Sequence, residues 1–232
     1  MIVLGGLQKN SFIDYPGKVS CVLFFSGCNF DCPYCHNPGL ARGRTGGSWI
    51  HEQAVYDFLE KRKGFLDGVV ISGGEPTLRQ DIITLCRKIK EMGYPIKLDT
   101  NGSRPQVIKQ LIDEGLIDYV AMDVKTAPYH YSPLFRKDSN PKDILSSIRT
   151  IMKSGLNYEF RTTCIKPIVD APVIRNIAGT IEGAVLYALQ RFRNGRVLHP
   201  EFFRGTDPHF REDELMDLKA AAASWVQRCI VR

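Results

Sequence analysis

Short apolar runs alternate with stretches of helical periodicity along most of the chain. Short apolar runs predict buried strands, and apolar positions at helical spacing predict helices with one face on a core. The pattern predicts six strands, over residues 18–25, 68–72, 95–99, 119–125, 158–165 and 184–189. It predicts helices over about 51–62, 82–89, 107–112, 144–152 and 172–182, and a last helix over about 212–228.

This alternation of strand and helix repeats about six times, which is typical of a parallel sheet with right-handed crossovers. Eight such units close a full barrel of about 250 residues. Six units in 232 residues predict an α/β fold, an incomplete and open (β/α)6 barrel. Because no internal repeat, low-complexity segment or linker interrupts the pattern, we expect residues 1–232 to form one domain, with the C-terminal helix packed on the barrel.

Polar and ligand-type residues gather where the predicted strands end. The segments are "SGCNFDCPYCHN" after the first strand, "SGGEP" after the second, "DTNG" at the end of the third, Asp123 and Lys125 near the end of the fourth, Arg161 on the fifth and "QRFR" after the sixth. Taken singly, each segment has an alternative interpretation as an ordinary turn or a structural ion pair. Parallel α/β folds bind ligands at the carboxyl ends of their strands, so their recurrence favours one shared site.

Composition narrows the function classes. The chain is 44% apolar and 24% charged, which argues against wholesale disorder. The net charge of +6 is modest, with one local concentration of arginines between 191 and 204. It fits an acidic partner protein or an anionic cofactor as easily as nucleic acid, and since no lysine-rich tail is present we do not expect nucleic-acid binding. The sequence shows neither an apolar run of about 20 residues nor a signal-peptide pattern, so we expect a cytoplasmic protein without membrane contact.

Three of the seven cysteines stand close together, as Cys28, Cys32 and Cys35 in the spacing C-x3-C-x2-C. In the cytosol, such clustering points to metal or redox chemistry. A structural zinc site needs four ligands, and His36 is an awkward fourth because it adjoins Cys35. The other cysteines lie in apolar patterns and are expected to be core thiols. A 4Fe–4S cluster held by three thiolates leaves one iron open, and we expect a substrate to be its fourth ligand.

The cysteine spacing, with Tyr34 before the last cysteine and "GGEP" after the second strand, resembles the radical S-adenosylmethionine (SAM) superfamily. The resemblance covers nearly the whole chain. It implies one 4Fe–4S cluster on Cys28, Cys32 and Cys35, with SAM chelating the open iron and being cleaved to a 5′-deoxyadenosyl radical. It also implies SAM contacts from Tyr34, His36, Asn37, Gly73, Gly74 and Glu75. Glycines let backbone approach a ligand, and a carboxylate complements the SAM ammonium.

The segments "CHNP", "LDTNG" and "MDVK" together resemble the glycyl-radical-enzyme activating branch, which includes pyruvate formate-lyase activating enzyme. The resemblance implies that Asp99, Thr100 and Asp123 hold a monovalent cation beside the SAM carboxylate. Lys125 and Arg161 match basic residues near SAM. Phe192 stands where that enzyme has a histidine, so it is either an adenine contact or a core residue.

The stretches "GGLQKNSFIDYPGK", "LQRFR" and "HPEFF" narrow the resemblance to anaerobic ribonucleoside-triphosphate reductase activating proteins. This implies a glycyl radical enzyme as partner, a flavodoxin or ferredoxin as electron donor, and no general base, so that the site residues bind and position. Two alternatives stay open. One is a radical SAM enzyme that modifies a small molecule or RNA. The other is a non-enzymatic Fe–S electron carrier or sensor, for which "GGEP" and "MDVK" would have no use.

Overall fold

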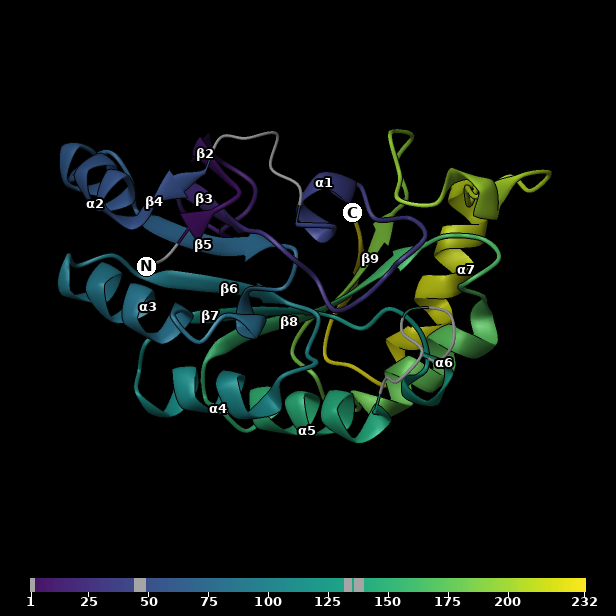
Figure 1. The fold of residues 1–232 in the computed structure, drawn as a ribbon. Coiled ribbons are helices and arrows are strands. Elements are labelled where there is room, and N and C mark those ends of the chain that lie inside the picture. Colours follow the sequence, from purple (N-terminus) through teal and green to yellow (C-terminus); the bar gives the residue numbers. More distant parts are fainter. Residues whose placement is uncertain (1–2, 44–48, 132–134, 136–139) are drawn as a thin grey trace.

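A curved sheet of eight strands forms the centre of the computed structural model (Figure 1), which describes residues 3–43, 49–131, 135 and 140–232. The strand order is β10-β9-β8-β7-β6-β5-β3-β2. Neighbouring strands from β3 to β10 run parallel, and β2 pairs antiparallel with β3. The strands are β2 (Gly6–Ser11), β3 (Ser20–Phe25), β5 (Gly68–Gly73), β6 (Ile96–Thr100), β7 (Tyr119–Asp123), β8 (Asn157–Cys164), β9 (Tyr187–Arg191) and β10 (Cys229–Val231). A separate ribbon pairs β1 (Val3–Leu4) with β4 (Ile50–His51).

The helices follow one another around the outside of this sheet (Figure 1). They are α2 (Glu52–Lys61), α3 (Ile82–Glu91), α4 (Pro105–Asp113), α5 (Pro141–Met152), α6 (Ala171–Thr180) and α7 (Glu212–Ala223), with short 3-10 turns at Pro76–Leu78, Pro128–His130 and Pro200–Phe203. The four-residue α1 (Pro38–Ala41) lies apart from this row (Figure 1) and buries no residue. The apolar faces of the helices in the row are buried against the sheet, as at Leu85, Ile89, Leu111 and Ile177. Burial of these faces is the main driving force that holds helix to sheet.

The open, partial barrel predicted from the sequence is confirmed, and so are its six parallel strands. The two edge strands were not predicted. Strand β2 reads "GLQKNS", with little apolar content, because an edge strand pairs on one side only. The last helix was expected to reach residue 228, but it ends at Ala223, and Cys229–Val231 extends the sheet beside β9. Cys229 is therefore a half-buried strand residue.

The sheet has a second, inner face without helices. Val22, Val70, Tyr119 and Ala121 point to this face, where they form a small apolar cluster with Tyr15. Paired residues on neighbouring strands share a face, and side chains alternate along each strand. The register pairs Val70 with Lys97, Lys97 with Tyr119, and Asp123 with Arg161, so the inner face also receives Lys97, Asp99, Asp123, Glu159 and Arg161. Charged side chains thus line the inside of the barrel.

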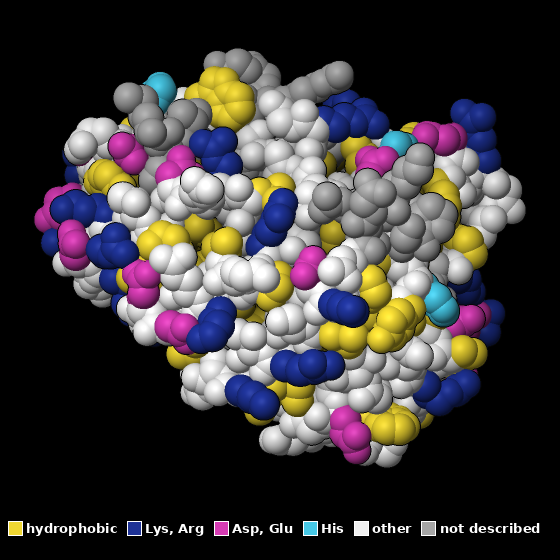
Figure 2. Space-filling view, turned by 60° about the horizontal axis from the view of Figure 1, so that its bottom comes forward, with side chains coloured by type: hydrophobic (Ala, Val, Ile, Leu, Met, Phe, Trp, Pro, Cys, Tyr) yellow, Lys and Arg dark blue, Asp and Glu magenta, His cyan; other side chains and the backbone are white. Residues whose placement is uncertain are grey.

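The outer surface over α3 to α5 has a mixed character. Figure 2 shows Lys and Arg interspersed with Asp, Glu and hydrophobic side chains on that face. Some of these charges form pairs between neighbouring elements, such as Arg87–Glu114 at 2.7 Å and Lys90–Asp118 at 2.7 Å. Within the described ranges, no helix combines the length and the apolar character that crossing a bilayer requires.

Candidate active site

A pocket with a cavity volume of about 240 Å³ lies at the carboxyl ends of the parallel strands. Parallel α/β folds bind their ligands at this end of the sheet. Every site residue predicted from the sequence lines it except Phe192: Cys28, Cys32, Tyr34, Cys35, His36, Asn37, Gly73, Gly74, Glu75, Asp99, Thr100, Asp123, Lys125 and Arg161. Asn101 and Thr163 also line it and were missed. Asn101 belongs to "DTNG", and Thr163 follows Arg161 by two on β8, which are signals that could have revealed both.

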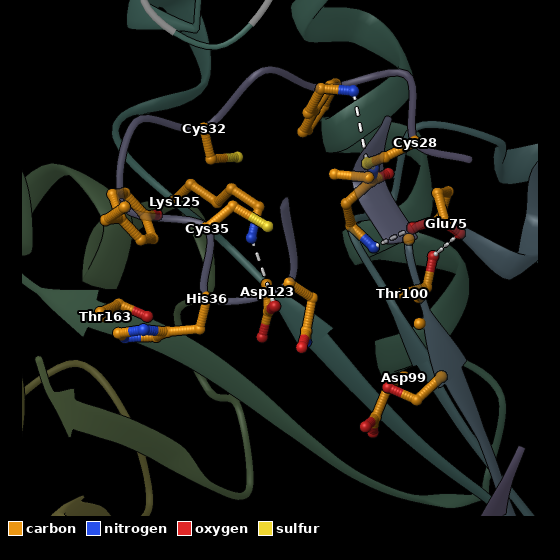
Figure 3. A pocket seen from close by; sticks show the side chains of 18 of the residues that line it. Cys28, Cys32, Cys35, His36, Glu75, Asp99, Thr100, Asp123, Lys125 and Thr163 are labelled. Carbon is orange, nitrogen blue, oxygen red and sulfur yellow. Dashed lines mark hydrogen bonds and ion pairs between the residues drawn. The ribbon is translucent and has the colours of Figure 1, made fainter. Parts of the chain in front are cut away.

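The cysteine loop, residues 26–37, connects β3 to α1. The sulfur atoms of Cys28, Cys32 and Cys35 point toward the space between them (Figure 3). Distant segments fix the loop, since Asp31 N–H donates to the Phe135 carbonyl at 2.7 Å and His199 N–H donates to the Pro33 carbonyl at 3.0 Å. The three thiols are therefore held on one side of the pocket by the fold itself.

These thiols suit a three-thiolate 4Fe–4S cluster. Soft sulfur donors are the ligands that iron–sulfur clusters use. Each thiolate binds a different iron of a cluster, so the ligands need not converge on one point. Among the residues that the structure describes, no three His, Cys, Asp or Glu side chains do converge as a single ion would require. Burial raises the pKa of the Cys28 thiol to about 11 and that of Cys32 to about 12, so a metal must displace their protons.

Gly73 and Gly74 pack against the cysteine loop. A Cβ at Gly73 would lie 2.3 Å from the Phe25 carbonyl oxygen, and Gly73 has a φ of 121°. A Cβ at Gly74 would lie 2.0 Å from the Gly27 carbonyl oxygen. Two hydrogen bonds join the segments, from Gly74 N–H to the Phe25 carbonyl and from Glu75 N–H to the Gly27 carbonyl, both at 2.9 Å. We expected Gly73 and Gly74 to let the backbone approach the ligand. In the structure, these glycines let the backbone approach Phe25 and Gly27 of the chain itself.

The Glu75 carboxylate is buried and satisfied by its own chain. It accepts hydrogen bonds from Thr77 N–H at 3.1 Å, the Thr77 hydroxyl at 2.5 Å, the Thr100 hydroxyl at 2.8 Å and Asn101 N–H at 2.6 Å. Burial raises its pKa, while these hydrogen bonds act in the opposite direction. We expected this carboxylate to face the SAM ammonium. The geometry instead shows it joining the loops that follow β5 and β6.

Two carboxylates and two cationic side chains form an ion network on the inner face. Arg161 Nε donates to Asp123 Oδ1 at 2.8 Å, and Arg161 Nη1 lies 3.4 Å from Asp99 Oδ1. Lys125 Nζ donates to Asp123 Oδ2 at 3.3 Å (Figure 3). Burial would raise the pKa of Asp123, but the charges of Arg161 and Lys125 outweigh it and hold the pKa at about 2. Asp123 is therefore ionised at neutral pH.

The residues expected around a monovalent cation already have partners in the chain. Asp99 contacts Lys97 Nζ as well as Arg161. The Thr100 hydroxyl donates to Glu75 and accepts from Gly102 N–H at 3.1 Å. Asp123 is paired with Lys125 and Arg161. This arrangement does not fit a bound monovalent cation.

Aromatic rings support one wall of the pocket. The His36 ring stacks on Phe192, with centroids 5.2 Å apart and planes at 18°, and Phe192 stacks on Phe203 at 6.1 Å. Phe192 thus lies behind His36 and packs against the core. The Tyr34 ring, which also lines the pocket, meets Phe135 edge-on at 6.0 Å. The Tyr34 hydroxyl is buried and has no hydrogen-bond partner among the described residues.

Comparisons with known proteins agree with this geometry. A family model described as "Radical SAM superfamily" matches residues 22–175. A Methanocaldococcus jannaschii protein named "putative glycyl-radical enzyme activating enzyme" is 37% identical over 99% of this chain and 95% of its own length. The pyruvate formate-lyase-activating enzyme of Clostridium pasteurianum is 32% identical over 51% of this chain and 50% of its own.

Among solved structures, Streptococcus suis SuiB bound to S-adenosylmethionine has a similar fold, with a TM-score of 0.67 at 14% identity. The match covers 91% of this chain and 51% of SuiB, so the chain spans about half the length of that neighbour. At this identity, the likeness concerns the fold alone.

Proposed function

The chain belongs to the radical SAM superfamily, and we propose that it is an activating enzyme that generates a glycyl radical on a partner enzyme. The observation behind the proposal is that the three thiols share one pocket with Asp123, Lys125 and Arg161. The similarity over 99% of the chain to a relative named as a glycyl-radical enzyme activating enzyme supports the same reading.

The proposed cofactors are one 4Fe–4S cluster and SAM. When bound, a reduced cluster and SAM would supply a 5′-deoxyadenosyl radical for hydrogen abstraction from a glycine Cα of the partner. Cys28, Cys32 and Cys35 would hold the cluster and leave one iron to SAM. Lys125 and Arg161 give the pocket positive charge that suits the SAM carboxylate.

The remaining side chains would position SAM rather than move protons. His36, backed by Phe192, presents a ring face suited to stacking with adenine. Asn37 and the Tyr34 hydroxyl offer hydrogen-bonding groups at the pocket wall. Because hydrogen-atom transfer needs no general base, holding the reacting atoms in place is the main task of the protein.

As the partner we propose an anaerobic ribonucleoside-triphosphate reductase, with a flavodoxin or ferredoxin as electron donor, all in the cytoplasm. The stretches "GGLQKNSFIDYPGK", "LQRFR" and "HPEFF" support the choice of partner. Arg193, Arg196 and Arg204 are exposed in the segment after β9 and suit an acidic protein surface. The open barrel gives a glycine loop a way into the pocket.

Isotope transfer tests this function. The cluster-loaded protein is reduced, given SAM and mixed with an anaerobic ribonucleotide reductase labelled with deuterium at glycine Cα. We expect a glycyl radical signal in electron paramagnetic resonance and deuterium in 5′-deoxyadenosine. If deuterium instead enters 5′-deoxyadenosine from a labelled free metabolite or RNA, and the reductase gives no radical, the protein is a radical SAM enzyme that modifies a small molecule or RNA.

A further inference from the structure

The ion network contains a further charged residue, Lys97, which was not predicted from the sequence. Lys97, in the middle of β6, has a side chain only 2% exposed, and its Nζ contacts Asp99 Oδ1. The register places it between Val70 and Tyr119, both members of the apolar inner cluster. An unpaired charge there would be strongly destabilising. Within the described residues, Asp99 is the carboxylate that pairs with it.

The ion network has one more positively charged than negatively charged side chain. Asp99 and Asp123 are negative, whereas Lys97, Lys125 and Arg161 are positive, and each carboxylate contacts two of the three cations. Deeper on the inner face, Glu159 pairs with Arg232 at 2.7 Å and adds no net charge. This network therefore contributes one net positive charge to the pocket, which matches a ligand carboxylate.

We infer that Lys97 and Arg161 take the place of a monovalent cation beside the SAM carboxylate, so that SAM binding by this chain does not depend on Na⁺ or K⁺. The inference rests on the proposed SAM site. Two carboxylates facing a ligand carboxylate require compensating positive charge. Here Arg161 bridges Asp99 and Asp123, and Lys97, two residues before Asp99 on β6, neutralises Asp99.

Lys97 is accordingly a positioning residue. It does not line the pocket, and it acts through Asp99. Without its charge, Asp99 would keep only the longer contact to Arg161, at 3.4 Å, and would repel the SAM carboxylate. A small cation from solution could then compensate, because carboxylate oxygens are ligands for hard cations.

The first test needs no variant. SAM binding to the cluster-loaded protein is measured by calorimetry in NaCl, in KCl and in choline chloride at equal ionic strength. We expect the three dissociation constants to agree within about twofold. A loss of about tenfold or more in choline chloride would overturn the inference. Absence of SAM binding in all three salts would instead count against the proposed function.

The second test uses a variant whose SAM binding should depend on a monovalent cation. Lys97→Met should weaken SAM binding about tenfold in choline chloride, and Na⁺ or K⁺ should restore most of it. Sodium-23 line broadening, which needs neither cluster turnover nor a partner, should appear in Lys97→Met and be absent from the wild type. Lys109→Met, which breaks the exposed pair with Asp113 on α4, is the matched control.

If Lys97→Met does not fold, the double variant Lys97→Met with Asp99→Asn removes both charges and should fold. If Lys97→Met does not fold, sodium-23 broadening measured on the wild type still tests the inference. Saturable sodium broadening in the wild type that disappears in Asp99→Asn contradicts the inference. So does a folded Lys97→Met that binds SAM as the wild type does in every salt.

Discussion

A side chain at Gly74 would place its Cβ 2.0 Å from the carbonyl oxygen of Gly27, the residue before Cys28. Backbone atoms cannot yield at that distance as a flexible side chain would. The end of β5 and the start of the cysteine loop are also joined by two hydrogen bonds, Gly74 to Phe25 and Glu75 to Gly27. The glycine pair therefore sets where the cysteine loop lies relative to the sheet.

Gly74→Ala should displace the loop and lower the free energy of unfolding by about 3 kcal/mol. The iron bound per chain after anaerobic reconstitution should fall with it. Gly6→Ala is the matched control, because a Cβ at Gly6 meets only Phe24 carbon atoms, at 3.5 Å or more. Wild-type stability and iron content in Gly74→Ala would show that the contact does not constrain the loop.

Glu75→Gln should destabilise the fold by about 3 kcal/mol in urea unfolding. The glutamine amide brings a donor where Glu75 now accepts from Thr77, Thr100 and Asn101. The loops after β5 and β6 would lose their connection, so SAM binding should also weaken. The exposed Glu60→Gln, on α2, serves as the control and should change stability little. A Glu75→Gln variant of normal stability but without SAM binding would favour the direct ammonium contact.

Asp123 makes a pH-dependent contribution to stability. Its pKa is held at about 2 because Arg161 and Lys125 outweigh the effect of burial, whereas an unfolded aspartate titrates near 3.9. The contribution, about 2 kcal/mol, is therefore present above about pH 4 and is lost as the pH falls toward about 2. The difference in unfolding free energy between the wild type and Asp123→Asn should stay constant from neutral pH to about 5 and shrink below it. A difference that stays constant down to pH 3 would contradict this assignment.

Phe192→Ala should weaken SAM binding about fivefold without changing the iron content, because His36 loses the ring that supports it. Phe192→Tyr keeps the stacked ring and should bind SAM as the wild type does. Phe65→Ala removes an exposed phenylalanine elsewhere and is the control. Unchanged SAM affinity in Phe192→Ala would mean that the stack plays no part in binding.

The sequence predicts much of this architecture because buried parallel strands and amphipathic helices leave strong periodic signals. It does not reveal β2, which has little apolar content, or β10, whose three residues are too few to give a periodic signal. Within the site, motif positions indicate which residues share the pocket, since strand ends converge. They do not indicate orientation. The burial of Glu75 among donors and the position of Phe192 behind His36 depend on long-range contacts.

Lys97 illustrates the same limit. In the segment "PIKLD" it reads as one polar residue in a strand, and only the register beside Val70 and Tyr119 shows that its charge is enclosed. A buried lysine is rare unless it is paired. Asp99 was predicted to be a cation ligand. In the structure, Lys97 neutralises Asp99 from a position two residues earlier on the same strand.

We expect the three thiols and this pocket to support SAM cleavage. The most direct measurement is 5′-deoxyadenosine formed by the reconstituted, chemically reduced protein with SAM under anaerobic conditions. Cys32→Ala should form none, and Cys86→Ala, which removes a buried core thiol on α3, should retain the activity. We predict product from the wild type and from Cys86→Ala only. A fully loaded, reduced wild-type protein that binds SAM and yields no 5′-deoxyadenosine, even with its partner present, would contradict the account.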